Sequence, residues 1–166
     1  MPNRDAPPMI QLTQSKWATV SEEDFDYLAQ WNWFAARAGK RWIAGRNSLN
    51  PDGKRETLLM HRVVAERAGI DTSRDIDHVN RDSLDNARKN LRAATRSENS
   101  RNSTGKHGKA SGLPKGVYRN RHRFMAIICL DYKNHYLGTF GTQEEAIAAY
   151  NAAASAFHGN FARFSI

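Results

Sequence analysis

The sequence predicts an α+β fold made of two small modules, each of which combines short antiparallel strands with a helix. Residues 103–114, rich in Ser, Gly, Lys and His, have the composition of a basic flexible linker. On each side of this linker, a Thr-x-x-Glu capping box marks the start of a helix: Thr95 with Glu98, and Thr142 with Glu145. The domains are therefore expected at residues 1–102 and 115–166.

The first module is expected to open with a strand and a helix. Residues 1–8 contain three prolines and should form a loose tail. A strand-like pattern covers residues 10–20. Ser21, which is followed by three acidic residues, is the expected cap of a helix that ends near Gln30.

The next predicted element is a hairpin, and three tryptophans lie within it or just before it. Trp31 and Trp33 lead into alternating residues, Gly39-Lys40 forms the turn, and Trp42 lies on the returning strand. A second turn at residues 50–53 then precedes a strand and a helix over residues 61–68. We expect the tryptophans to be core or sheet-face residues, and stacking on a nucleic-acid base is the alternative.

Residues 70–102 predict a compact ββα unit. Strands are expected over residues 76–79 and 91–94, with a polar loop over residues 80–90 between them. The helix that begins after Thr95 places Asn99 one turn into that helix.

The second module predicts a three-stranded antiparallel sheet packed on one helix. The strands cover residues 115–120, 123–130 and 134–140, and the helix runs from residue 142 to about residue 158. Gly159 ends it. On 3.6-residue spacing, the expected core residues are Ala146, Ala149, Tyr150, Ala153 and Phe157 of the helix and Val117, Phe124, Ala126, Ile128 and Leu137 of the sheet.

Positive charge is concentrated in one part of a chain whose net charge is +8. Between Arg96 and Arg123 there are eight Lys or Arg residues and one acid, which favours a nucleic-acid footprint; a solvated basic linker is the alternative. The single cysteine, Cys129, excludes an internal disulfide and a cysteine-rich zinc finger. With no run of about 18 apolar residues and no leader, we expect a cytoplasmic protein without a membrane partner.

Asp77 and His78, followed by Asn90 and Asn99, are the strongest candidates for catalysis. Phosphodiester hydrolysis needs a base to deprotonate water and a cation to hold the leaving oxygen. We expect His78 to be the base, and the oxygens of Asp77 and Asn99 to hold one divalent cation. Neighbouring strand residues point to opposite faces, so the strand should end or bulge at Asp77-His78. Asn90 is expected to brace the 80–90 loop.

Residues 57–102 resemble an HNH endonuclease of the ββα-metal class, in its phage-borne homing-endonuclease branch. The resemblance places the base on His78, the loop brace on Asn90 and the metal ligands on Asp77 and Asn99. It implies an oxygen-donor site for one Mg²⁺ or Mn²⁺ ion in preference to zinc. His61 and Arg62, which follow Met60, could approach the phosphate, and a packing or surface role is the alternative.

Residues 115–162 resemble the Apetala/ethylene-response-factor type of DNA-binding domain, through Lys-Gly-Val-Tyr at 115–118 and Tyr-Leu-Gly-Thr-Phe at 136–140. The resemblance implies that the exposed sheet face enters the major groove of double-stranded DNA. Ile127 and Cys129 stand where plant members commonly carry Arg and Glu, so phosphate contacts should dominate over base readout. The expected DNA-binding residues of the whole basic region are Arg96, Arg101, Lys106, Lys109, Lys115, Tyr118, Arg119, Asn120, Arg121, Arg123, Asn134 and Tyr136.

These observations together predict a divalent-metal-dependent endonuclease that hydrolyses duplex DNA inside a phage-infected bacterial cell. A DNA-binding protein with an inactive nuclease module is the main alternative. A nuclease acting on RNA is a third, which the sheet module disfavours. One catalytic set per chain favours a monomer that nicks one strand, and a dimer that makes a double-strand break is the other possibility.

Overall fold

The computed structural model describes residues 6–102, 112–162 and 164, and divides into two compact units, Met1–Ala94 and Thr95–Ile166. The described part contains four α-helices and several small antiparallel sheets, which confirms the predicted α+β class. The division falls before residue 95, earlier than the sequence indicated, because α3 (Arg96–Asn102) packs against the 3-10 turn η2 (Gly159–Phe161). Lys106, Lys109 and most of the expected linker lie outside the described residues. No helix within the described ranges is long and apolar enough to cross a bilayer.

A small hairpin and a helix open the first unit. Strands β1 (Met9–Gln11) and β2 (Trp17–Thr19) pair antiparallel, and α1 (Glu22–Ala29) follows them. The helix starts where expected, but the predicted side-chain cap is wrong: Ser21 makes no capping hydrogen bond. Its Oγ instead accepts a hydrogen bond from the backbone N–H of Arg88, at 2.9 Å. The Ser21 hydroxyl, which the local pattern assigned to capping α1, is therefore used in a long-range contact instead.

The central sheet has the order β3-β4-β5, with strands β3 (Phe34–Ala38), β4 (Arg41–Leu49) and β5 (Arg55–Leu59). Helix α2 (Met60–Arg67) follows directly. The three tryptophans differ in burial. Trp33 is a core residue, 4 % exposed, and Trp42 packs partly buried against the core, whereas Trp31 is 42 % exposed.

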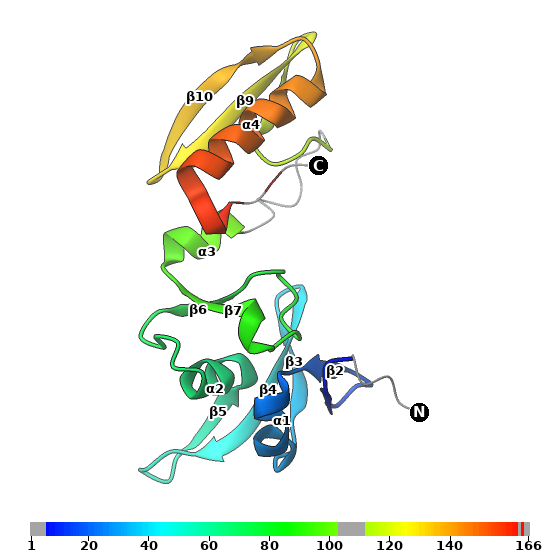
Figure 1. The fold of residues 1–166 in the computed structure, drawn as a ribbon, viewed down its shortest axis with the longest axis vertical. Coiled ribbons are helices and arrows are strands. Elements are labelled where there is room, and N and C mark those ends of the chain that lie inside the picture. Colours follow the sequence, from blue (N-terminus) through cyan, green and yellow to red (C-terminus); the bar gives the residue numbers. More distant parts are fainter. Residues whose placement is uncertain (1–5, 103–111, 163, 165–166) are drawn as a thin grey trace. The chain divides into compact units, whose positions relative to one another are not determined.

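A two-stranded ladder completes the first unit (Figure 1). Strand β6 (Asp75–His78) pairs antiparallel with β7 (Leu91–Ala94), and the 3-10 turn η1 (Arg88–Asn90) ends the loop between them. Thr19 of β2 pairs with this loop: its N–H donates to Leu84 O and its carbonyl accepts from Asn86 N. The core that supports the ladder consists of Ile10, Leu12, Ala18, Val20, Leu28, Trp33, Ala35, Ala44, Met60, Val64, Ala65, Ile76 and Leu91.

The second unit is a three-stranded antiparallel sheet with α4 (Gln143–His158) lying across one face (Figure 1). The strands are β8 (Val117–Asn120), β9 (Arg123–Leu130) and β10 (Lys133–Phe140), in the order β10-β9-β8. The predicted capping box of Thr142 and Glu145 is present. One core assignment is wrong: Phe157 is 59 % exposed, while Ala154 and His158 are buried.

That correction has a geometric reason. The buried residues of α4 are spaced four apart, at positions 146, 150, 154 and 158. Such a stripe drifts around the helix by about 40° per step, so at the end of α4 it passes through position 158. Position 157 then lies about 100° around the helix from 158, away from the sheet. Close packing of α4 on the sheet also requires glycine at position 116, where φ is +79° and an added Cβ would lie 2.0 Å from Cδ2 of Tyr150.

Candidate active site

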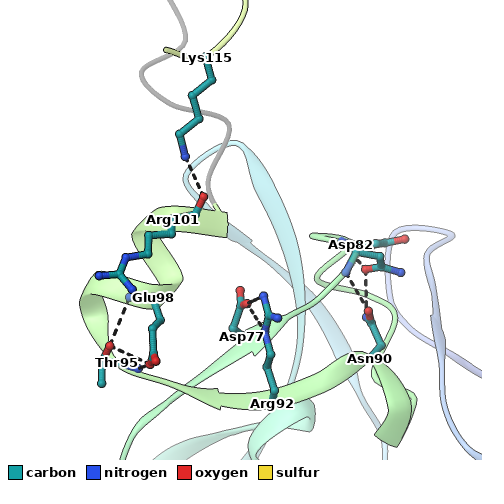
Figure 2. Close-up of polar contacts among 9 residues, drawn as sticks. Asp77, Asp82, Asn90, Arg92, Thr95, Glu98, Arg101 and Lys115 are labelled. Atoms are coloured by element: carbon teal, nitrogen blue, oxygen red, sulfur yellow. Dashed lines mark hydrogen bonds and ion pairs between the residues drawn. The ribbon is translucent and has the colours of Figure 1, made fainter. Parts of the chain in front are cut away.

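The carboxylate of Asp77 is buried against an arginine on the neighbouring strand. Asp77 is 6 % exposed, and its Oδ2 accepts hydrogen bonds from Nε and Nη2 of Arg92, at 2.9 and 2.7 Å (Figure 2). The two residues are direct partners in the β6–β7 register, so their side chains share one face of the ladder. The guanidinium offsets the cost of burying the negative charge.

His78 is the last residue of β6, and its imidazole takes different partners from Asp77. Its Nε2 lies 3.3 Å from Oδ1 of Asn86. The Nδ2 of Asn86 donates to Leu84 O at 3.3 Å, which leaves Oδ1 as the acceptor for the imidazole. The hydrogen bond therefore places the proton of a neutral imidazole on Nε2 and the basic lone pair on Nδ1.

The pairing of β6 is regular up to His78, where the strand ends without a bulge. The chain turns at once, because Arg81 N donates to His78 O and Arg81 adopts a φ of +68°. Ending the strand is one of the two geometries that the sequence allowed for the Asp77-His78 pair.

Burial is the main influence on the protonation of His78. It lowers the pKa of His78 below the ordinary histidine value, while the hydrogen bond to Asn86 and the carboxylates of Asp77, Asp82 and Asp85 act in the opposite direction. The net direction is downward, so His78 is neutral at pH 7. A neutral imidazole with a basic Nδ1 is the form that can accept a proton.

His61 of α2 packs against His78 with the rings edge to face, the centroids 5.3 Å apart and the planes at 73°. Burial lowers the pKa of His61 to about 4. Repulsion from His78 in its protonated form and from Arg62 acts in the same direction. Arg62 is turned to the α2–β6 connection, where its Nη2 donates to Thr72 O at 2.6 Å. Sequence reasoning left His61 open between the phosphate and a packing role, and here it contacts the candidate base.

We expect His61→Gln to make folding less sensitive to acid. Between pH 6.5 and about pH 4, the unfolded chain binds a proton at His61 that the folded chain excludes, so the free energy of unfolding falls as the pH drops through this window. From about pH 7.5 to about pH 5, urea denaturation should show wild type losing about 1 to 2 kcal/mol more stability than the variant. Equal losses in the two proteins would show that His61 is not the source.

Asn90 holds the two ends of the 80–90 loop together (Figure 2). Its Oδ1 accepts from the backbone N–H of Asn80 at 2.9 Å. Its Nδ2 donates to Asn80 Oδ1 at 3.0 Å and to Asp85 O at 2.7 Å. The side chain is 5 % exposed, so these hydrogen bonds are formed away from water.

Asn99 lies on α3, in the second unit. The predicted capping box at the start of α3 is present: Glu98 Oε2 accepts from Thr95 N at 2.7 Å, and Thr95 Oγ1 accepts from Glu98 N at 3.2 Å (Figure 2). Asn99 N donates to Thr95 O in the first turn.

The donor set suits a hard cation that is bound in part by substrate. Within the described ranges, no three His, Cys, Asp or Glu side chains are grouped as a metal site. Magnesium, however, is often held by only one or two carboxylates together with substrate phosphates and water. The buried carboxylate of Asp77 and the side-chain amide of Asn99 each offer oxygen donors of that kind, and they belong to different units of the structure.

The residues expected to bind DNA take two kinds of position in the second unit. On β8, β9 and β10 the exposed residues include Tyr118, Arg119, Asn120, Arg123, Cys129, Asn134 and Tyr136, and Arg121 lies exposed in the β8–β9 turn. Arg101 instead pairs with Asp131 at 3.1 Å, and Lys115 Nζ donates to Arg101 O at 2.7 Å. These two basic side chains make contacts within their own unit.

Comparison with known proteins finds a similarity over the segment that carries the candidate site. Residues 58–101 match the HNH endonuclease family. An uncharacterized HNH endonuclease, L560, of Acanthamoeba polyphaga mimivirus is 24 % identical over 149 residues, which cover 88 % of this chain and 73 % of that protein. The matched segment, which is similar to HNH endonucleases, contains Asp77, His78, Asn90 and Asn99. HNH endonucleases act on DNA and generally use a divalent metal.

Two residues of the site escaped sequence reasoning, Arg92 and Asn86, and so did the contact between His61 and His78. The predicted strands placed Arg92 on the partner strand, but pairing residues 76–79 with 91–94 end to end sets position 92 opposite position 78. The observed register differs by one residue and pairs Asp77 with Arg92. Asn86 carried no such signal, since the loop contains several similar polar residues.

Proposed function

We propose that this protein is a divalent-metal-dependent endonuclease that hydrolyses phosphodiester bonds of duplex DNA, with His78 as the general base. The observation that carries the proposal is a neutral, half-buried imidazole at the end of a strand, next to a buried carboxylate, within the matched HNH segment. In homing endonucleases of this class, which the sequence resembles, the same residue types perform the same roles.

In this mechanism, Nδ1 of His78 takes a proton from the attacking water as the water oxygen bonds to phosphorus and the bond to the 3′ oxygen breaks. Asn86 holds the Nε2 side of the ring and so fixes the tautomer. Asp77 and Asn99 would hold the cation, whose chemistry is to neutralise charge on the phosphate and on the departing oxygen. Arg92 orients the Asp77 carboxylate through two hydrogen bonds, and Asn90 fixes the loop that follows His78.

The second unit would be the DNA-binding module, of the Apetala/ethylene-response-factor type. Its three-stranded antiparallel sheet with one helix on a single face leaves the opposite face for a ligand. By strand register that face carries Tyr118, Arg123 and Tyr136, whereas Arg119 lies beside Phe124 on the helix side. Ile127 and Cys129, also on the face opposite the helix, offer little to base edges. Contacts to phosphates would then position the protein more than they select a sequence.

A second candidate function is DNA binding without cleavage. It is favoured by one contact: two N–H donors of Arg92 already occupy Oδ2 of Asp77, where they compete with a cation. In that case the chain would bind duplex DNA tightly and cut nothing.

We expect supercoiled plasmid to be nicked or linearised when magnesium is present and to stay intact when EDTA removes it. Asp77→Asn should raise the magnesium concentration needed for half-maximal cleavage by roughly tenfold or more, because the carboxylate is the only charged ligand proposed. The measurement is a magnesium titration of plasmid cleavage on agarose gels. Tight binding without cleavage at any magnesium concentration would favour the second candidate, and an unchanged magnesium requirement would remove Asp77 as a ligand.

Binding of the chain to duplex DNA should weaken steeply with salt. If roughly six to ten phosphates are contacted, affinity should fall by about 10³ to 10⁵ between about 50 and 200 mM salt. Arg121→Gln, on the exposed β8–β9 turn, should make the plot of log affinity against log salt shallower by about one phosphate. Fluorescence anisotropy with a labelled duplex measures both effects. A flat salt response would rule out phosphate contacts as the main source of affinity.

A further inference from the structure

A hollow on the first unit lies apart from the residues assigned to cleavage. It has a volume of about 380 Å³ and is lined by the segment that leads into β3 and by residues of β4. Trp31, Asn32 and Trp33 come from the first segment, and Arg46 and Asn47 come from β4. Its size and its aromatic wall with a few polar groups are those of a small-ligand site.

Arg46 is the charged group of this hollow. Its guanidinium carbon lies 4.2 Å from the ring centroid of Trp31 and 5.7 Å from that of Trp33. The Nε of Arg46 is buried and has no hydrogen-bond partner. A buried N–H donor without an acceptor costs about 1 to 3 kcal/mol, and more when it is charged. An acceptor oxygen from a ligand would remove this cost, and an anionic oxygen would do so best.

The two tryptophans are held differently. Trp33 is 4 % exposed, and its Nε1 donates to Leu28 O at 2.8 Å, so it is a fixed part of the core. Trp31 is 42 % exposed, although burying an indole is favourable. An exposed indole beside a cation offers a stacking surface for a flat ring. The side-chain amides of Asn32 and Asn47 add donors and acceptors at the same place.

We propose that this hollow binds one unpaired nucleotide of DNA, whose base stacks on Trp31 and whose phosphate accepts from Arg46. A flat ring, an anionic oxygen and hydrogen-bonding edges occur together in a nucleotide, and each has a counterpart among these residues. The nucleotide must be unpaired, because a base inside a duplex is already stacked on both faces. The inference rests on the proposed function only in taking DNA as the ligand.

The test is a titration of the full chain with fluorescein-labelled oligothymidylate, which forms no duplex. Trp31→Ala should weaken binding roughly 5- to 150-fold, the usual range for losing one stacked base, whereas Trp31→Phe keeps a ring and should stay within about threefold of wild type. Arg46→Gln should also weaken binding. Trp17→Ala is the matched control, because Trp17 is 49 % exposed in the same unit but does not line the hollow, and it should bind as wild type does.

Photocross-linking locates the base directly. An oligonucleotide with one 5-iododeoxyuridine, irradiated in complex with the protein, should cross-link to the peptide that contains Trp31. Circular dichroism melting of each variant separates lost binding from lost folding. Binding that is equal in wild type and Trp31→Ala, or a cross-link confined to the second unit, would overturn the proposal.

The same experiment separates this inference from the proposed function. If the chain cleaves no DNA but Trp31→Ala still weakens single-strand binding, the endonuclease proposal fails and the nucleotide site stands. If the chain cleaves DNA and Trp31→Ala has no effect on single-strand binding, the nucleotide site is refuted and the endonuclease proposal stands.

Discussion

His78→Ala should lower the rate of DNA cleavage by about 10² to 10⁴, the usual contribution of a general base. The imidazole is neutral, its Nε2 is bound to Asn86, and its Nδ1 carries the basic lone pair, so alanine removes the group that accepts the proton. The adjacent His61 cannot substitute without moving, because its ring packs edge to face against that of His78. Single-turnover cleavage of a labelled duplex measures the rate.

The loss should be confined to the chemical step. Affinity for duplex DNA should change little, because the residues proposed to contact the phosphates of the duplex lie in the second unit. His135→Ala is the matched control: this histidine is exposed on β10, is not among the proposed contacts, and should leave cleavage unchanged. If His78→Ala cleaves at the wild-type rate, the base is another group and the proposed mechanism is wrong.

The parts of the fold that the sequence predicted were those with local signals. The two capping boxes, the Gly39-Lys40 turn and the end of α2 near Gly69 depend on residues a few positions apart, and the structure has each of them. Asp77, His78 and Asn90 were selected by residue type and spacing, and the hydrogen bonds of Asn90 within the 80–90 loop involve neighbours in sequence. Short-range chemistry of this kind can be inferred from a single sequence.

The contacts that were missed join distant parts of the chain. His61 and His78 meet only because α2 packs against the end of β6. The pattern predicted Ser21 as a helix cap, but its hydroxyl oxygen accepts a hydrogen bond from the backbone N–H of Arg88. The local pattern assigned Ser21 to the start of the helix and left the role of His61 open. In both cases a tertiary contact decides what the side chain binds, and no periodicity of the sequence predicts such a contact.

Asp24 shows the same effect most strongly. By position it is one of three acids in the first turn of α1, where a solvated carboxylate would interact with the helix dipole. It is in fact 0 % exposed. Its Oδ1 accepts from Arg67 Nε at 2.9 Å and Arg88 Nη2 at 2.8 Å, and its Oδ2 accepts from Arg88 Nε at 2.6 Å. The carboxylate therefore joins α1 to α2 and to η1, next to Asn90.

Asp24→Asn should lower the free energy of unfolding by about 3 kcal/mol, because it leaves two arginines without their shared anion. The hydrogen bonds from Arg88 are the largest cause of the lowered pKa of Asp24, so the carboxylate stabilises the fold above its unfolded pKa near 3.8 and loses this effect as the pH falls further. Urea denaturation at neutral pH measures the loss as a lower midpoint. Asp71→Asn is the control, since that carboxylate is about half exposed and lies 3.4 Å from Arg74, and its denaturation midpoint should stay much closer to that of wild type. Because Arg88 begins the turn that ends at Asn90, Asp24→Asn should also speed amide hydrogen exchange in the 80–90 loop. Equal midpoints for the two variants would mean that the buried triad stabilises the fold no more than a surface pair does.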